Sequence, residues 1–125
     1  MRKQYHFRPS DCGLRAWDVD RLIALTKDLP RAQVPLSAIR EIDEPYWSTR
    51  HDTPLTCRAL VEHLSLIEQA ELIFPIILSS DGRVMDGMHR VAKALMRGDQ
   101  SIEAVRFAND PAPDYVGVSP DDLPY

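Results

Sequence analysis

The sequence predicts a small α/β (α+β) domain, in which a short sheet packs with about three helices. Its 125 residues are one domain's length, and the 44% hydrophobic and 27% charged residues are typical of a globular protein. The central part alternates helical patterns with short apolar runs. Glycine and proline bound these runs, as expected where helices end and turns begin.

Three segments carry helix signals: residues 18–29, 56–70 and 88–97. The first begins at the capping residue Asp18 and the third stops at Gly98, a favourable C-terminal cap. The second is expected to bury one apolar stripe, formed by Leu60, Val61, Leu64 and Ile67. The expected buried stripe of the third consists of Met88, Val91, Ala92 and Leu95.

Short apolar runs predict four strands, at residues 33–36, 74–78, 83–86 and 102–107. The second run is almost wholly apolar, as in a strand buried on both faces, and a turn joins it to the third. Residues 1–17 show no clear periodicity. The expected organisation is an N-terminal extension with one helix (1–32), a central domain (33–108) and a Pro-rich acidic tail (109–125).

The charges are distributed unevenly. Fifteen Lys and Arg against nineteen Asp and Glu give a formal net charge of −4. Four acids follow Phe107, where no base occurs: Asp110, Asp114, Asp121 and Asp122. Residues 1–108 are therefore neutral overall, which argues against a protein that coats nucleic acid through bulk positive charge. Any anion site must be a local cluster of donors.

Membrane and secretory classes are not expected. No apolar run approaches the roughly 20 residues of a membrane span, and the first residues lead into no apolar signal segment. The two cysteines, Cys12 and Cys57, are far apart and are explained best as free thiols in a reducing compartment. We therefore expect a cytoplasmic protein.

The chemistry-bearing stretch is the passage from a strand into a helix at Asp86-Gly87-Met88-His89-Arg90. A helix N-terminus offers free backbone N–H groups and a partial positive charge. Gly87 allows a sharp turn and the close approach of a ligand. His89 and Arg90 add side-chain donors at the same end. The motif therefore predicts a binding site for phosphate or carboxylate.

Carboxylates could act beside this turn. Asp86 either caps the helix or holds a magnesium ion or a substrate hydroxyl. The loop after the first central strand carries Glu41, Asp43 and Glu44, which could supply a general base or magnesium ligands. Glu44 is the preferred base because Pro45 restricts its geometry and aromatic residues follow.

The remaining polar and aromatic groups have simpler explanations. Tyr46 and Trp47 could stack on a nucleobase, although packing against the core is the commoner role of such residues. Lys93 and Arg97 fit a solvated helix face. No role is predicted for the other histidines, which are His6, His51 and His63.

Residues 33–107 resemble the ParB N-terminal domain-like and sulfiredoxin-like fold family. The resemblance rests on the segments VPLSAI, PIILSSDGRVMDGMHRVAKALMRG and AVRF. The DGMHR motif is closest to that of the streptomycin-type pathway regulators, and similar motifs occur in the family's free-serine kinases. The resemblance implies a short mixed sheet and a bound nucleotide (ATP, ADP or CTP) with Mg²⁺. It also implies phosphate contacts at Gly87, the Met88 backbone, His89 and Arg90.

Three departures separate the sequence from individual members. Sulfiredoxins have a catalytic cysteine where Met88 stands, and because a thioether forms no thiolate, sulfinic-acid reduction is not expected. Partition proteins have Gln-Pro-Arg where Glu44-Pro45-Tyr46 is the nearest match, which weakens the case for CTP. The chain leaves no room for a helix-turn-helix, so we do not expect it to bind DNA alone.

We therefore expect a domain that binds a nucleotide or another small phosphorylated ligand at the Asp86–Arg90 turn. In an enzymatic form, a nucleotide-dependent phosphotransferase, Glu44 would act as base and Asp86 would hold substrate or Mg²⁺. His89 and Arg90 would stabilise the phosphate charge. The alternative is a non-catalytic regulatory or adaptor domain, of the chromosome-partitioning or transcription-regulator type, with a protein or DNA partner. A homodimer is compatible with both.

Overall fold

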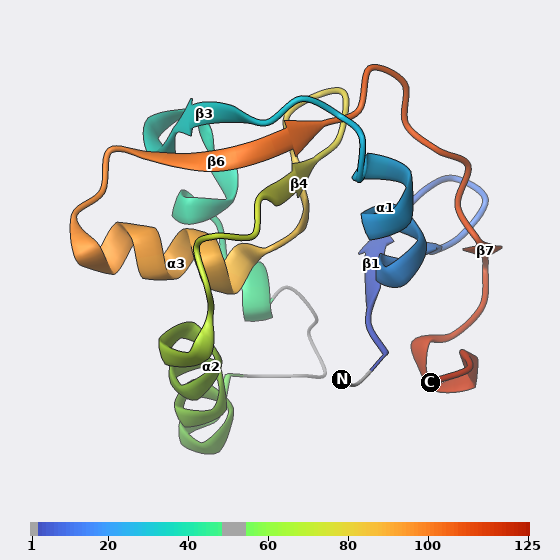
Figure 1. The fold of residues 1–125 in the computed structure, drawn as a ribbon. Helices are drawn as coiled ribbons and strands as arrows, with labels where there is room; N and C mark the ends of the chain where they lie inside the picture. Colours follow the sequence, from blue (N-terminus) through green and yellow to red (C-terminus); the bar gives the residue numbers. More distant parts are fainter. Residues whose placement is uncertain (1–2, 49–54) are drawn as a thin grey trace.

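The computed structural model describes residues 3–48 and 55–125. It confirms the predicted α/β class, since this part of the chain forms three α-helices and two small sheets of three and four strands (Figure 1). No helix among these residues is both long enough and apolar enough to span a membrane.

The larger sheet is mixed and lies at the centre of the molecule. Its strands run in the order β3 (Ala32–Pro35), β6 (Ser101–Arg106), β4 (Ile76–Leu78) and β5 (Val84–Asp86). β6 and β4 are parallel, and the other two pairs are antiparallel. Helix α3 (Met88–Arg97) follows β5 directly and makes the crossover to β6. This crossover places the N-terminus of α3 at the end of a central hairpin.

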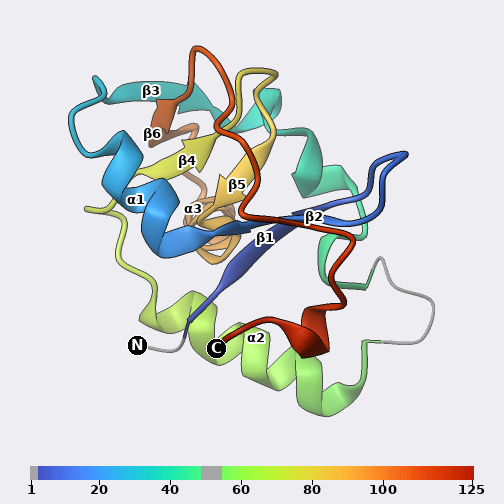
Figure 2. The same ribbon diagram turned by 90° about the vertical axis from the view of Figure 1, so that its right-hand side faces the viewer.

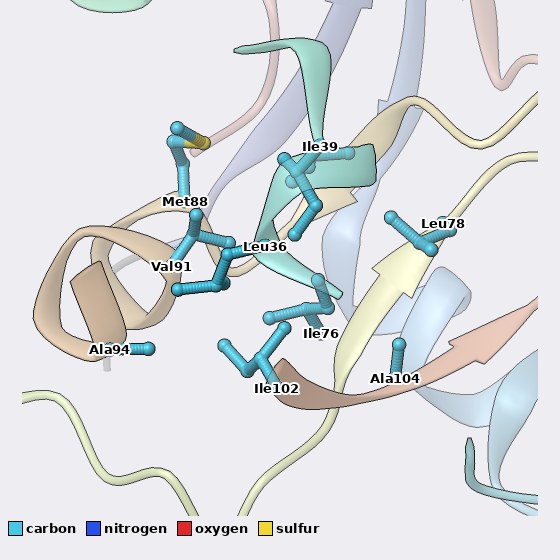
Figure 3. Packing of buried hydrophobic residues seen from close by; sticks show 10 residues of the cluster. Leu36, Ile39, Ile76, Leu78, Met88, Val91, Ala94, Ile102 and Ala104 are labelled. Atoms are coloured by element: carbon cyan, nitrogen blue, oxygen red, sulfur yellow. The ribbon is translucent and has the colours of Figure 1, made fainter. Parts of the chain in front are cut away.

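One face of this sheet packs against α3 and a short 3₁₀ turn (Figure 3). Because successive side chains of a strand alternate between faces, Ile76 and Leu78 point to this side and Ile77 to the other. Val91 and Ala94 of α3 have no exposed surface. Their partners include Leu36, Ile39, Val84, Ile102 and Ala104.

The other face is covered by the N-terminal extension. Here β2 (Arg15–Asp18) and α1 (Val19–Thr26) contribute Trp17 and Leu22 to a core cluster completed by Ile77, Met85, Val105 and Phe107. As predicted, Asp18 caps α1, since its carboxylate accepts a hydrogen bond from Asp20 N at 2.9 Å. The helix ends at Thr26, three residues before the predicted end.

The smaller sheet joins the two ends of the chain. β1 (Tyr5–Arg8) pairs with β2, and β2 pairs with β7 (Tyr115–Val116) of the acidic tail, both antiparallel (Figure 2). Residues 1–17, for which no element is predicted, therefore contribute a hairpin. The tail is also held by hydrogen bonds, from Trp17 Nε1 to Pro111 O at 2.8 Å and from Asp18 N to Asp114 Oδ2 at 2.8 Å.

Helix α2 (Cys57–Gln69) differs most from its prediction. Thr56 caps it by accepting a hydrogen bond from Ala59 N at 3.1 Å. Of the expected buried stripe, only Ile67 is buried, and Leu60, Val61 and Leu64 are exposed. The helix packs beside the first half of α3 instead of on the sheet, so only a narrow stripe of it faces the protein (Figure 1).

A similar correction applies to α3. Its buried residues are Met88, Val91 and Ala94, whereas Leu95 is half exposed and Ala92 is intermediate. The spacing of three residues rotates the buried stripe away from Leu95, because the crossover brings a narrow face of the helix onto the sheet.

Candidate functional site

The predicted turn has the backbone geometry of an open helix N-terminus. Gly87 stands at the N-cap position of α3 with φ = 104°, and no side chain of the described residues caps the helix. The first backbone hydrogen bond runs from Val91 N to Gly87 O at 3.0 Å. The N–H groups of Met88, His89 and Arg90 precede this bond, as in the first turn of any α-helix. Such groups can bind an anion.

The turn opens into a cleft of about 850 Å³. Five of the six predicted site residues line it: Glu44, Asp86, Gly87, Met88 and His89. The opposite wall is β1 with its neighbours, Gln4–Pro9, and Pro120 of the acidic tail also contributes. The cleft therefore lies between the central sheet's β5–α3 turn and the sheet that joins the chain ends.

Arg90, the sixth predicted residue, does not line the cleft. Its Nη2 lies 3.2 Å from Asp86 Oδ2, forming an ion pair, and donates a hydrogen bond to Pro75 O at 3.2 Å. Asp86 does not cap α3 through a side-chain hydrogen bond, so the first of its two predicted roles is wrong. It lines the cleft while paired with Arg90, and its role in holding Mg²⁺ or a substrate hydroxyl stays a prediction. The guanidinium keeps positive charge next to the open N–H groups.

The three acids of the loop have different environments. Asp43 is exposed and does not line the cleft, whereas Glu41 and Glu44 do. Glu44 is partly exposed and forms an ion pair with Arg83, Nη1 to Oε2, at 3.0 Å. Glu41 is only 5% exposed, and its Oε2 accepts a hydrogen bond from Val84 N at 2.7 Å. The loop thus brings two carboxylates into one cleft, one solvated and one buried.

His89 lies in a stack that the sequence does not predict. Its ring stacks on Trp47 and on His63, with centroids 5.0 and 5.2 Å apart, and Trp47 stacks on His63 at 4.5 Å. His63 Nδ1 and His89 Nε2 are 2.9 Å apart and share a hydrogen bond. Burial lowers the pKa of both histidines, which favours the neutral form of each ring. This stack ties α2 to the start of α3.

No local signal could have identified His63, because its partner lies 26 residues away on another helix. Of the other histidines for which no role is predicted, His51 lies outside the described residues. His6 lines the cleft from β1. Trp47 packs against the core, which is the commoner of its two predicted roles, and it also lines the cleft. Stacking on a nucleobase stays a prediction.

Two further groups of the cleft are held in their uncharged forms. Burial, reinforced by the negative charges of Glu41 and Asp86, raises the pKa of the Tyr46 phenol to about 12. Burial and the nearby Arg8 guanidinium lower the pKa of His6 to about 4. The His6 Nε2 atom is buried and has no hydrogen-bond partner among the described residues. The cleft therefore presents neutral aromatic walls beside its carboxylates.

The low pKa of His6 predicts a pH dependence of stability. The unfolded chain takes up this proton near pH 6.5 and the folded chain only near pH 4, so acidification through this window favours unfolding. Between about pH 7 and pH 5 the wild type should lose about 1–2 kcal/mol that His6→Phe retains. Urea unfolding at both pH values measures this difference. If both proteins lost the same unfolding free energy between pH 7 and pH 5, the assignment to His6 would be contradicted.

The open N-terminus of α3 and the nearby carboxylates could bind an anion together with a metal cation. The described residues contain no group of three His, Cys, Asp or Glu side chains arranged to hold a metal ion. Mg²⁺ bound with a nucleotide usually takes only one or two carboxylates plus phosphate oxygens, and Asp86 and Glu44 are two acidic residues that line the cleft. Comparison of the chain with protein-family models, with curated proteins and with solved structures finds no match.

Proposed function

We propose that this protein binds a phosphorylated ligand, preferably a nucleotide, at the Asp86–Arg90 turn. The observation that carries the proposal is the uncapped N-terminus of α3, which opens into the cleft. The cleft volume falls within the range of about 300–1,000 Å³ that is usual for small-molecule sites. The resemblance of residues 33–107 to a nucleotide-binding family favours the same ligand class.

Phosphoryl transfer is the enzymatic form of this proposal. Its support is that Glu44 and Asp86, on separate elements, line the same cleft as the helix N-terminus. Glu44, steadied by Arg83, would accept the proton of a substrate hydroxyl. Asp86 would hold that hydroxyl or a nucleotide-bound Mg²⁺, which neutralises phosphate charge. His89 and the α3 N–H groups would stabilise the phosphate oxygens.

Isothermal titration calorimetry with ATP, ADP and CTP, with and without Mg²⁺, tests the binding. Arg90→Ala should weaken nucleotide binding by about tenfold or more, because it removes a positive charge and leaves Asp86 unpaired beside the phosphates. Arg97→Ala, at the far end of the same helix, is the matched control and should bind normally. The proposal fails if the wild type binds no nucleotide or if the two variants behave alike.

A non-catalytic adaptor is the second candidate. The observation that favours it is the exposed apolar side of α2, formed by Leu60, Val61 and Leu64, because such patches often mark protein-binding surfaces. Phosphoryl transfer to a hydroxylated acceptor that is lost in Glu44→Gln, with nucleotide affinity retained, would establish the enzyme. Nucleotide-dependent association without turnover would establish the adaptor.

A further inference from the structure

We infer that, besides a nucleotide, the cleft takes phosphorylated ligands with a protonated amine, which the carboxylate of Glu41 binds. The inference rests on the proposed function for the anionic part of the ligand, and it adds a second recognition group at a separate point of the cleft. Three features of the described residues support it: an unpaired buried oxygen, an excess of negative charge and a neighbouring phenol.

Glu41 is buried, and only one of its two carboxylate oxygens has a hydrogen-bond partner among the described residues. Its side chain is 5% exposed, and its Oε2 is fixed by the backbone N–H of Val84 at 2.7 Å and lies 3.9 Å from Arg83 Nε. The other oxygen, Oε1, is buried without a hydrogen-bond partner among residues 3–48 and 55–125. A buried carboxylate oxygen without a donor is costly. Since Glu41 is among the residues that line the cleft, a ligand bound there is the inferred source of that donor.

The charges of the cleft favour a cationic donor. The guanidinium of Arg90 offsets Asp86 from outside the lining. The described lining itself contains the four carboxylates of Glu41, Glu44, Asp81 and Asp86 and the two guanidiniums of Arg8 and Arg83, which leaves one carboxylate in excess. Both guanidiniums are already engaged: Arg8 lies 3.6 Å from Asp81 Oδ1, and Arg83 pairs with Glu44. A ligand bearing only phosphate would add negative charge to this surface. An ammonium group on the same ligand offsets it.

Tyr46 provides a further oxygen in the cleft that Glu41 also lines. The negative charges of Glu41 and Asp86 both act on the Tyr46 phenol, which lines the cleft with them. An ammonium group has three N–H donors, which a carboxylate oxygen and a phenol oxygen can accept together. A divalent cation is less suited to the position beside Glu41 and Tyr46, because such an ion needs several oxygen ligands in a strict geometry.

The experiment compares pairs of ligands that differ only in the amine. ω-Aminoalkyl phosphates with two to five carbons are titrated against alkyl phosphates of the same length, by calorimetry and by NMR chemical shifts. For the aminoalkyl phosphate of suitable length, the wild type should show about tenfold or greater preference over its partner, as expected for a charge-assisted hydrogen bond. Glu41→Gln should lose this preference and keep its affinity for the alkyl phosphate. Asp43→Asn, in the same loop but outside the cleft lining, should keep the preference.

The outcomes separate this inference from the proposed function. Equal affinity of the wild type for both members of every pair overturns the amine site and leaves phosphate binding standing. Binding of the aminoalkyl phosphates that depends on Glu41 but not on Arg90, with no binding of alkyl phosphates, supports the amine site and overturns the phosphate site.

A preference that persists in Glu41→Gln overturns the assignment to Glu41. Stabilisation of the wild type, but not of Glu41→Gln, by MgCl₂ alone would show that the unpaired Glu41 oxygen binds a metal ion, and it would overturn the amine site. The comparison within the wild type needs no variant, so the inference can be refuted even if Glu41→Gln does not fold.

Discussion

Gly87→Ala should lower the free energy of unfolding by about 2–4 kcal/mol, one of the largest losses expected from so small a change. At φ = 104° a side chain is strained against its own backbone. An added Cβ would also lie 2.7 Å from Ile76 Cγ2 and 2.8 Å from Arg90 Nη2. Relief of these contacts requires α3 to move away from β4, which would displace the N–H groups of the proposed phosphate site.

Gly98→Ala is the matched control at the other end of α3. Gly98 also has a positive φ, 78°, but an added Cβ there meets no atom of the described chain within 4 Å beyond its immediate neighbours. It should cost only about 1 kcal/mol, the backbone penalty alone. Denaturant unfolding of both variants isolates the packing contribution at Gly87. Equal losses would mean that the close approach of Ile76 and Arg90 is relieved at no cost.

Local signals explain why the central elements could be predicted. Asp18 and Thr56 cap their helices through hydrogen bonds to residues two and three positions later, and Gly98 ends α3 in the left-handed conformation. These interactions depend only on neighbouring residues. The same holds for the strand-to-helix turn at Gly87. Its position and its open N–H groups follow from a few consecutive residues.

The missed features depend on how the elements pack, apart from one local ion pair. In β1, Tyr5 and Phe7 alternate with polar residues, but over four residues only. In β2 the two buried residues, Ala16 and Trp17, are adjacent, so the hairpin shows no sustained alternation. The apolar stripe of α2 predicts burial, but Leu60, Val61 and Leu64 stay exposed among the described residues. Arg90 carries a charge suited to phosphate, yet the turn of the helix directs it to Asp86 four residues earlier. The exposure and the partners of these side chains therefore depend on the folded structure, which the local sequence pattern does not determine.

The two glutamates of the loop show the same limit within the site. Proline and aromatic neighbours favour Glu44 as the functional acid on sequence grounds, and the structure places Glu44 in the cleft. The burial of Glu41, however, depends on Val84, which lies 43 residues later and donates its N–H to the carboxylate. No pattern within the loop distinguishes a solvated acid from a buried one.

Trp17→Ala should destabilise the whole chain by about 3–5 kcal/mol and lower its melting temperature by about 10–20 °C. The indole is 3% exposed and packs against the central sheet, where its cluster includes Ile77 and Val105. Its Nε1 also donates to Pro111 O, so the substitution loosens the acidic tail as well. Ile23→Ala, on the exposed side of α1, is the control and should change stability by less than about 1 kcal/mol.

The form of the transition separates two views of the N-terminal extension. If residues 1–32 were an appendage to an independent central domain, Trp17→Ala would unfold the extension first, and circular dichroism would show two transitions. Because Trp17 and Leu22 complete one face of the core under β4, β5 and β6, we expect a single transition at lower temperature. The β1 wall of the cleft belongs to the same sheet as Trp17, so ligand affinity should fall together with stability. A stable variant with unchanged affinity would show that the cleft does not need this wall.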